Sequence, residues 1–180
     1  MWYPLRRSIL VLIIMILTLP YSNIVSGNIS QAQIKAVFLY NFSSFVRWPK
    51  TAYATPNSAF NYCTIGMDDV VKILPSVIAE ESVNQHPLKH TPLKATDDMQ
   101  FCHIVYIALQ NKQMSRKIIN KTHGNPILLV SSMTDFHSLG GAITLSFKRK
   151  RVHPIINITA IHSLNITVNA KLMRLATVIK

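Results

Sequence analysis

Apolar side chains recur at helical spacing in residues 34–49, near the start of the chain. The residues on one side of such a helix are Ile34, Val37, Phe38, Asn41, Phe42, Phe45 and Trp48. Pro49 ends the helix, because proline lacks an N–H and restricts the residue before it. The pattern predicts an aromatic-rich helix that carries one amide, Asn41, near the middle of its buried face.

Shorter apolar runs alternate with helical patterns in the rest of the chain. Expected strands cover residues 62–66, 101–109, 127–130, 142–147, 152–158 and 166–168, and residues 86–92 form a loop or a weak edge strand. Three further helices are expected. The first follows the cap Asp68, the second covers residues 113–120, and the third runs from the N-cap Asn169 to Ile179.

This alternation of strands and helices favours right-handed crossovers and a largely parallel sheet. The two strands joined by residues 148–151 add an antiparallel hairpin at one edge. With helices on both faces, the sequence predicts a three-layer α/β fold with a mostly parallel central sheet.

The two cysteines, Cys63 and Cys102, occupy the same level in the strands YCTI and FCHI. If these strands are parallel neighbours, the two positions lie about 5 Å apart, which is within reach of a disulfide. That places the first strand beside the third, as in flavodoxin-like sheets. Two buried free thiols are the alternative, and counting thiols in the unfolded, unreduced protein distinguishes them.

Residues 1–27 have the pattern of an export signal. Arg6 and Arg7 precede an apolar run over residues 9–19, and small residues at Ser26 and Gly27 suit cleavage. The run has 11 residues, whereas a membrane-spanning helix needs about 20. We therefore expect residues 28–180 to form a single exported domain.

The expected mature chain is strongly basic. It keeps 17 Lys and Arg against seven Asp and Glu, a net charge of +10. Outside the cytoplasm, nucleic acid is not an expected partner, and anionic lipid, acidic polymers or an acidic protein face take its place. The cations concentrate in Lys148, Arg149, Lys150 and Arg151. This run fits either a solvated hairpin turn or an electrostatic contact with a membrane surface or a partner.

The sequence argues against catalysis. Its five glycines form neither a P-loop nor a dinucleotide fingerprint, and no G-x-S-x-G motif is present. Cys102 and His103 point to opposite faces of a strand, so they cannot act as a dyad. His86 and His90 would lie about 13 Å apart in a strand, too far for one metal ion. We expect no catalytic residue, metal or cofactor.

Six blocks of the sequence form a recognisable series. They are IKAVFLYNFSSFVRWP at residues 34–49, YCTIG at 62–66, FCHIVYI at 101–107, ILLVSSMTDFHSLGGAITL at 127–145, IINI at 155–158 and VNAKLMRLA at 168–176. Together they cover essentially the whole expected mature domain, and taken together they resemble YfiR-like proteins.

The resemblance implies a periplasmic α/β protein, commonly a homodimer, with a disulfide between the positions of Cys63 and Cys102. It further implies a regulatory protein that binds the periplasmic region of an inner-membrane diguanylate cyclase and represses it, so that release raises cyclic-di-GMP and promotes biofilm formation. Some members carry a second cysteine pair, which this chain lacks. The alternative function is a periplasmic small-ligand sensor that has a pocket at the carboxyl ends of the parallel strands and no cyclase partner.

Overall fold

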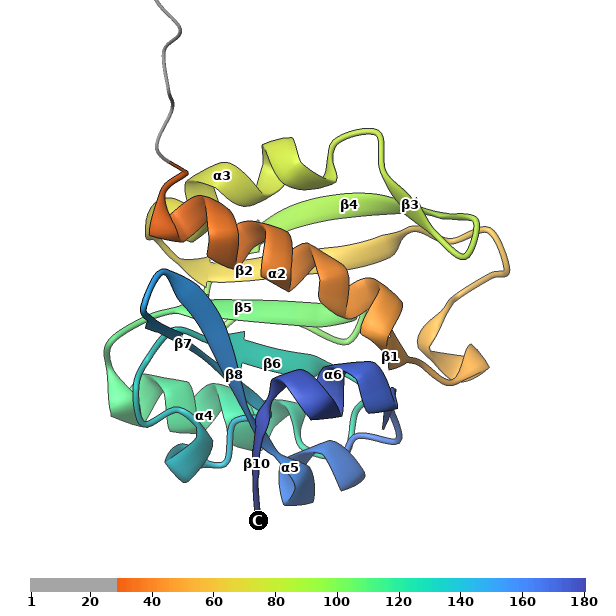
Figure 1. Cartoon of the computed structure of the whole chain (residues 1–180). Coiled ribbons are helices and arrows are strands. Elements are labelled where there is room, and N and C mark those ends of the chain that lie inside the picture. Colours follow the sequence, from red (N-terminus) through yellow and green to blue (C-terminus); the bar gives the residue numbers. More distant parts are fainter. Residues whose placement is uncertain (1–28) are drawn as a thin grey trace, which may run out of the picture.

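The computed structural model describes residues 29–180, which build a mixed sheet flanked by helices (Figure 1). The strand order in the eight-stranded sheet is β10-β8-β7-β6-β5-β2-β4-β3. Its strands are β2 (Phe60–Gly66), β3 (Ser82–Val83), β4 (His86–Leu93), β5 (Ile104–Ala108), β6 (Leu128–Ser131), β7 (Ile143–Lys148), β8 (Arg151–Asn157) and β10 (Thr177–Ile179). A separate antiparallel pair joins β1 (Val46–Arg47) to β9 (Thr167–Val168).

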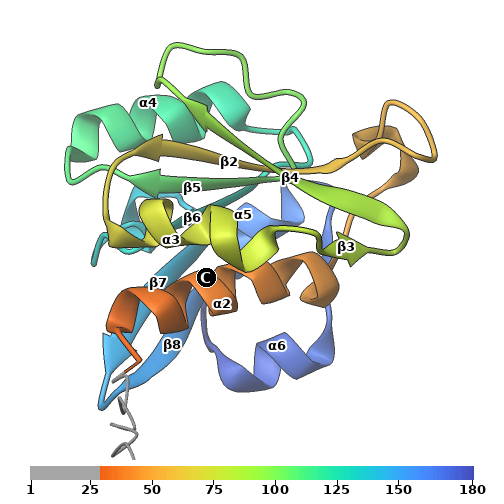
Figure 2. The same ribbon diagram turned by 90° about the horizontal axis from the view of Figure 1, so that it is seen from above.

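Helices cover both faces of the sheet. They are α2 (Gln31–Phe45), α3 (Asp69–Ile78), α4 (Lys112–Thr122), α5 (Ile158–His162) and α6 (Ala170–Leu175), with short 3-10 turns at Lys50–Ala52 and His137–Leu139. The helices α2 and α3 pack on one face, and α4 lies on the other (Figures 1 and 2). The predicted three-layer α/β class is confirmed.

Five parallel strands occupy the centre in the order β4-β2-β5-β6-β7. The first long strand thus lies beside the third, as the cysteine spacing predicts. The chain leaves β2 toward β4 on one side and then returns to β5 on the other side. In sheets of this kind, such a reversal of strand order creates a crevice outside the carboxyl ends of the strands.

The two faces of the sheet bury separate apolar clusters. One cluster joins α2, α3 and the C-terminal elements to the face that carries Phe60, Tyr62 and Tyr106. The other joins α4 to the face that carries Cys63 and Val105. Because successive side chains of a strand alternate between faces, β2 and β5 contribute to both clusters.

The predicted buried stripe of α2 is wrong in orientation. The helix buries Lys35, Ala36, Leu39, Phe42 and Ser43, of which only Phe42 belongs to the predicted stripe. The buried face is centred about a third of a turn away, because the sheet and α3 cover the side of α2 that carries Ala36, Leu39 and Ser43. The helix also stops at Phe45, before Trp48, and the chain becomes extended there.

One consequence is that part of the predicted stripe stays accessible. Val37 is 47% exposed, and Ile34, Phe38, Asn41 and Phe45 are partly buried. The Asn41 side chain donates to the Val37 carbonyl oxygen at 2.8 Å, so its amide serves the helix itself and not the core.

The C-terminus also differs from the prediction of one helix to Ile179. The helix α6 ends at Leu175, and Thr177–Ile179 forms the edge strand β10 parallel to β8. The β-branched residues of this segment favour a strand, and pairing covers an edge of β8 that would otherwise be open. The predicted N-caps Asp68 and Asn169 are confirmed, since both side chains accept backbone N–H bonds. The expected signal at residues 1–27 lies outside the described residues.

Candidate functional site

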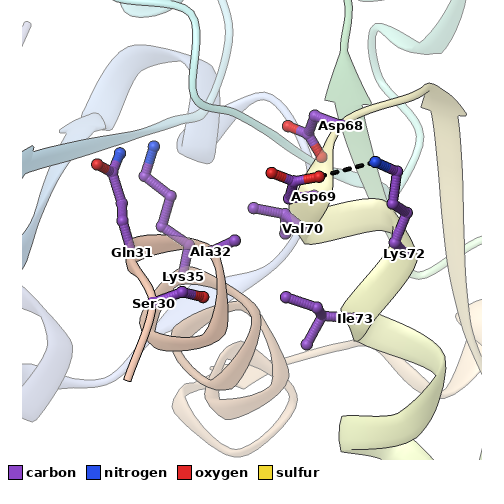
Figure 3. A pocket seen from close by; sticks show the side chains of 9 residues that line it. All are labelled: Ser30, Gln31, Ala32, Lys35, Asp68, Asp69, Val70, Lys72 and Ile73. Atoms are coloured by element: carbon purple, nitrogen blue, oxygen red, sulfur yellow. Dashed lines mark hydrogen bonds and ion pairs between the residues drawn. The ribbon is translucent and has the colours of Figure 1, made fainter. Parts of the chain in front are cut away.

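A crevice opens where the first turns of α2 and α3 meet the carboxyl end of β2 (Figure 3). It has a volume of about 480 Å³. Its lining comprises Ser30, Gln31, Ala32 and Lys35 from α2 and its cap, and Asp68, Asp69, Val70, Lys72 and Ile73 from α3 and its cap. Sequence reasoning named none of these residues as a site, although a lysine inside an apolar helix was an available signal.

Asp68 ties this crevice to the central strands. One carboxylate oxygen accepts the Val71 backbone N–H at 2.9 Å, and the other accepts the Tyr106 hydroxyl at 2.8 Å. The Tyr106 hydroxyl also lies 2.9 Å from the Ser132 hydroxyl. Burial is the main cause that raises the pKa of Tyr106, so this phenol is a neutral donor at any physiological pH.

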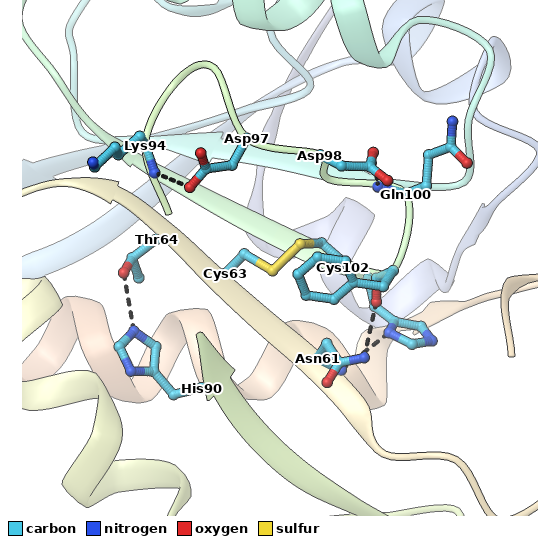
Figure 4. Close-up of a disulfide and its surroundings, with 11 residues drawn as sticks. Asn61, Cys63, Thr64, His90, Lys94, Asp97, Asp98, Gln100 and Cys102 are labelled. Atoms are coloured by element: carbon cyan, nitrogen blue, oxygen red, sulfur yellow. Dashed lines mark hydrogen bonds between the residues drawn. A yellow bond between two sulfur atoms is a disulfide. The ribbon is translucent and has the colours of Figure 1, made fainter. Parts of the chain in front are cut away.

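A disulfide joins Cys63 to Cys102 on the opposite face of the sheet, where both residues are buried (Figure 4). Their Cα atoms are 5.9 Å apart. The expectation that they occupy the same level of paired strands is wrong, because Cys63 pairs with Val105 in the β2–β5 register. Cys102 lies in a turn that precedes β5. Its backbone N–H donates to the Met99 carbonyl oxygen at 2.9 Å.

Asn61 and α4 hold this turn in place. The Asn61 side-chain amide donates to the Phe101 carbonyl oxygen at 2.9 Å, and the Asn61 backbone carbonyl oxygen accepts the His103 backbone N–H at 3.0 Å. From α4, Lys121 donates to the carbonyl oxygens of Thr96 and Asp97 at 2.9 and 2.7 Å. The bridge therefore fastens the connection between β4 and β5 to the sheet.

His103 points away from the bridge into an aromatic cluster. Its ring stacks on Phe60 at a centroid distance of 4.5 Å and lies 4.7 Å from the ring of Tyr53. The Nδ1 atom accepts the Asn61 backbone N–H at 3.0 Å. Burial is the main cause that lowers the pKa of His103 to about 4, and the nearby His86 lowers it further, against an opposing contribution from the Ala52 carbonyl.

The basic run forms the tip of the β7–β8 hairpin. Lys148 and Arg151 pair across it, and Arg149 and Lys150 form the two-residue turn between them. All four side chains are exposed, and Arg149 and Lys150 have positive φ angles of 49° and 60°. Turns of this type prefer Asn and Gly, so the two cations sit where their backbone is locally unfavourable.

The remaining candidate residues, His86 and His90, contact different partners. His86 faces the Ser58 carbonyl oxygen at 2.7 Å, and His90 faces the Thr64 hydroxyl at 2.9 Å. Among residues 29–180, no group of three His, Cys, Asp or Glu side chains is placed to hold a metal ion. In the same part of the chain, no helix combines the length and apolarity needed to cross a membrane.

Comparison with protein-family models matches residues 32–177 to the family described as YfiR/HmsC-like. The match includes α3, all of α2 except Gln31, and the two disulfide cysteines. A search of curated proteins found no match.

Replacing both cysteines by alanine is expected to lower the free energy of unfolding by about 4 kcal/mol, because the bridge closes a loop of 39 residues in the unfolded chain. Denaturant unfolding of the exported protein and of the double variant measures the difference. Thiol counting on the unfolded, unreduced wild type should find no free thiol, and two free thiols would contradict the bond. The single variant Cys63→Ala, with one free thiol, calibrates the assay.

The folded protein should lose stability in acid through His103. Its imidazole is neutral when folded, whereas the unfolded chain binds a proton near pH 6.5. The contribution of His103 to the free energy of unfolding is at its maximum above about pH 6.5 and declines as the pH falls toward 4. Below about pH 4 the free energy of unfolding is lower by about 3 kcal/mol because of this residue.

His103→Asn keeps an acceptor for the Asn61 N–H but does not titrate, so the unfolding free energy should fall less steeply between pH 6.5 and 4. A smaller decline remains, because burial also lowers the pKa of His90. An unchanged slope in His103→Asn would refute the assignment.

Proposed function

The chain belongs to the YfiR/HmsC-like family, and on that premise we propose that it is an exported, non-catalytic regulatory protein of the periplasm. In this proposal, residues 1–27 are a signal peptide that is removed on export, and residues 28–180 are the working domain. The protein represses an inner-membrane diguanylate cyclase by binding its periplasmic region. The observation that carries the proposal is the family match over residues 32–177.

The accessible side of α2 supports a binding role. We define the α2 stripe as Ile34, Val37, Phe38, Asn41 and Phe45, which together leave apolar surface facing outward. Val37 lies at its centre and is 47% exposed. At the far end of the stripe, the Lys171 ammonium lies 5.7 Å from the centre of the Phe45 ring. An apolar patch with a charged margin is the usual composition of a protein-binding surface.

Repression would follow from differential affinity. A regulator that binds the inactive state of the cyclase more tightly than the active state shifts the population toward inactivity. Each tenfold difference in affinity between the two states contributes about 1.4 kcal/mol to that shift. In this proposal the protein works as a homodimer.

The disulfide has a supporting role in the proposal. It fastens the segment before β5, and β5 is the central strand on which the α2–α3 face packs. Reduction would loosen this segment and weaken the binding-competent fold. Redox stress in the envelope would then relieve repression without any contact between the bond and the cyclase.

Val37→Glu tests the α2 stripe. The side chain is half exposed, so the fold should tolerate the charge, whereas a desolvated contact with a partner should not. In cells that contain a candidate cyclase, wild type should lower cyclic-di-GMP and Val37→Glu should lower it at least tenfold less effectively at equal periplasmic level. The readouts are cyclic-di-GMP content and co-purification of the cyclase from detergent-solubilised envelope.

Met114→Glu is the matched control, because Met114 is 37% exposed on α4, across the sheet from α2. It should repress as wild type does. If wild type leaves cyclic-di-GMP unchanged with every cyclase of its own cell, the regulatory proposal is wrong. If Val37→Glu represses normally, the contact lies elsewhere on the protein.

The cationic turn at residues 148–151 is the second proposed contact, directed at anionic lipid or an acidic face of the cyclase. Replacing all four residues by serine should weaken association with vesicles of anionic phospholipid at low salt, since each cation near such a surface contributes about 1 kcal/mol. Sedimentation with vesicles at low and high salt measures it. Equal binding by both proteins at low salt would assign the run to a solvated turn.

A further inference from the structure

The crevice between α2 and α3 lies where open α/β sheets bind ligands. The order β4-β2-β5 reverses the direction of strand addition at β2, and the crevice lies outside the carboxyl end of that strand. Asp68 follows β2, and its bond to Tyr106 reaches across to β5. The first turns of two helices, α2 and α3, also direct their free N–H groups toward this place.

Lys35 is the unusual residue of this crevice. It is only 8% exposed, yet among residues 29–180 it has neither a hydrogen-bond partner nor an ion-pair partner. Figure 3 shows its side chain extending from α2 beside that of Gln31, with Asp68 and Asp69 across the gap. Burial lowers the pKa of Lys35, and the charge of Asp68 partly opposes that shift.

The other charges of the crevice already have partners. Asp68 uses both oxygens, one on the Val71 N–H and one on the Tyr106 hydroxyl. Asp69 and Lys72 pair with each other at 2.8 Å. Lys35 is therefore the one crevice charge that has no partner in the described part of the chain. The Lys35 side chain is mostly buried, but its ammonium opens into the crevice without a partner in the described chain, so it is placed to meet a ligand that carries a negative charge.

We propose that Lys35 binds the carboxylate of a small polyhydroxylated monocarboxylate, a molecule of the sugar-acid type, in this crevice. A volume of about 480 Å³ is that of a small-molecule site. The carboxylates of Asp68 and Asp69 repel a second negative charge and accept bonds from hydroxyl groups, as do the side-chain oxygens of Ser30 and Gln31. The apolar side chains of Ala32, Val70 and Ile73 face the C–H groups of the ligand.

The basic hairpin tip adds attraction from a distance. Both views show the β7–β8 tip beside the start of α2, at the same end of the sheet as the crevice (Figures 1 and 2). Its four exposed cations raise the local concentration of anions without touching the ligand. This attraction is screened by salt, whereas the contact with the buried Lys35 is screened much less.

The site does not rest on the proposed cyclase partner. A ligand can bind here whether or not the α2 stripe contacts another protein. Because Lys35 is on the buried side of α2 and Val37 on the exposed side, variants at the two positions report separately on ligand and partner.

Titration of the exported protein with gluconate, followed by amide chemical shifts, tests the proposal. Sorbitol has the same carbon chain and hydroxyl groups but no carboxylate, so it isolates the contact with Lys35. Gluconate should shift the amides of residues 30–35 and 68–73 in a saturable way, and sorbitol should bind at least tenfold more weakly. At about a hundred times its dissociation constant, gluconate should raise Tm by roughly 5–10 °C.

Lys35→Met keeps the buried stem and removes the charge. It should abolish saturable gluconate binding and raise the Tm of the free protein, whereas a lysine with a purely structural role would lower it when replaced. Lys72→Met is the matched control, because Lys72 lines the same crevice but is exposed and pairs with Asp69. It should bind gluconate within threefold of wild type.

Three outcomes would overturn the proposal. One is the absence of saturable gluconate shifts in wild type, and another is equal gluconate binding by Lys35→Met. The third is tighter binding of inorganic phosphate than of gluconate, which would indicate a general anion site.

Discussion

The parallel pairing of β2 with β5 is the contact on which the rest of the structure depends. It brings together two strands separated in the chain by a helix, two further strands and a loop. On one face it lets Cys63 meet Cys102, and on the other it directs Tyr106 toward Asp68. Side chains alternate along each strand, so a single register places a covalent bond and a polar crevice on opposite sides of the same pair.

The two faces of the sheet differ in how firmly their covering elements are held. The α4 face is tied by the disulfide and by the Lys121 contacts to the loop before β5. The α2–α3 face has no such bond, and its helices are joined to the sheet by packing and by single hydrogen bonds such as that from Tyr62 to the Tyr40 carbonyl oxygen. Binding surfaces are drawn from the less constrained parts of a fold, and two of the proposed contacts, the α2 stripe and the Lys35 crevice, involve the helices of the α2–α3 face.

Lys35 and the tip of the β7–β8 hairpin are two of the places where the local structure is unfavourable for folding. Lys35 is buried without a partner in the described chain, and Arg149 and Lys150 adopt a left-handed backbone that Gly or Asn would adopt with less strain. Local rules are most often broken at functional sites, where binding offsets the cost. Both of these places lie at the carboxyl end of the parallel strands, the same end as the crevice.

Much of the architecture is readable from the chain. The alternation of apolar runs and capped helices predicts the three layers, and the caps Asp68 and Asn169 are where the residue types require them. The neighbouring positions of β2 and β5 follow from the two cysteine contexts. These features depend on local periodicity and on residue chemistry, which sequence carries directly.

Other features depend on contacts that no local pattern encodes. The register of β2 against β5, the turn that brings Cys102 within reach, and the edge strand β10 arise from long-range hydrogen bonding. The face that α2 buries includes Ala36 and Ser43, which a count of large apolar residues misses, because that face depends on which elements cover the helix. The sequence by itself determined the fold class, the helix caps and the family. Only the tertiary structure decided that Lys35 is buried at a crevice and Val37 is exposed, because burial depends on which elements meet.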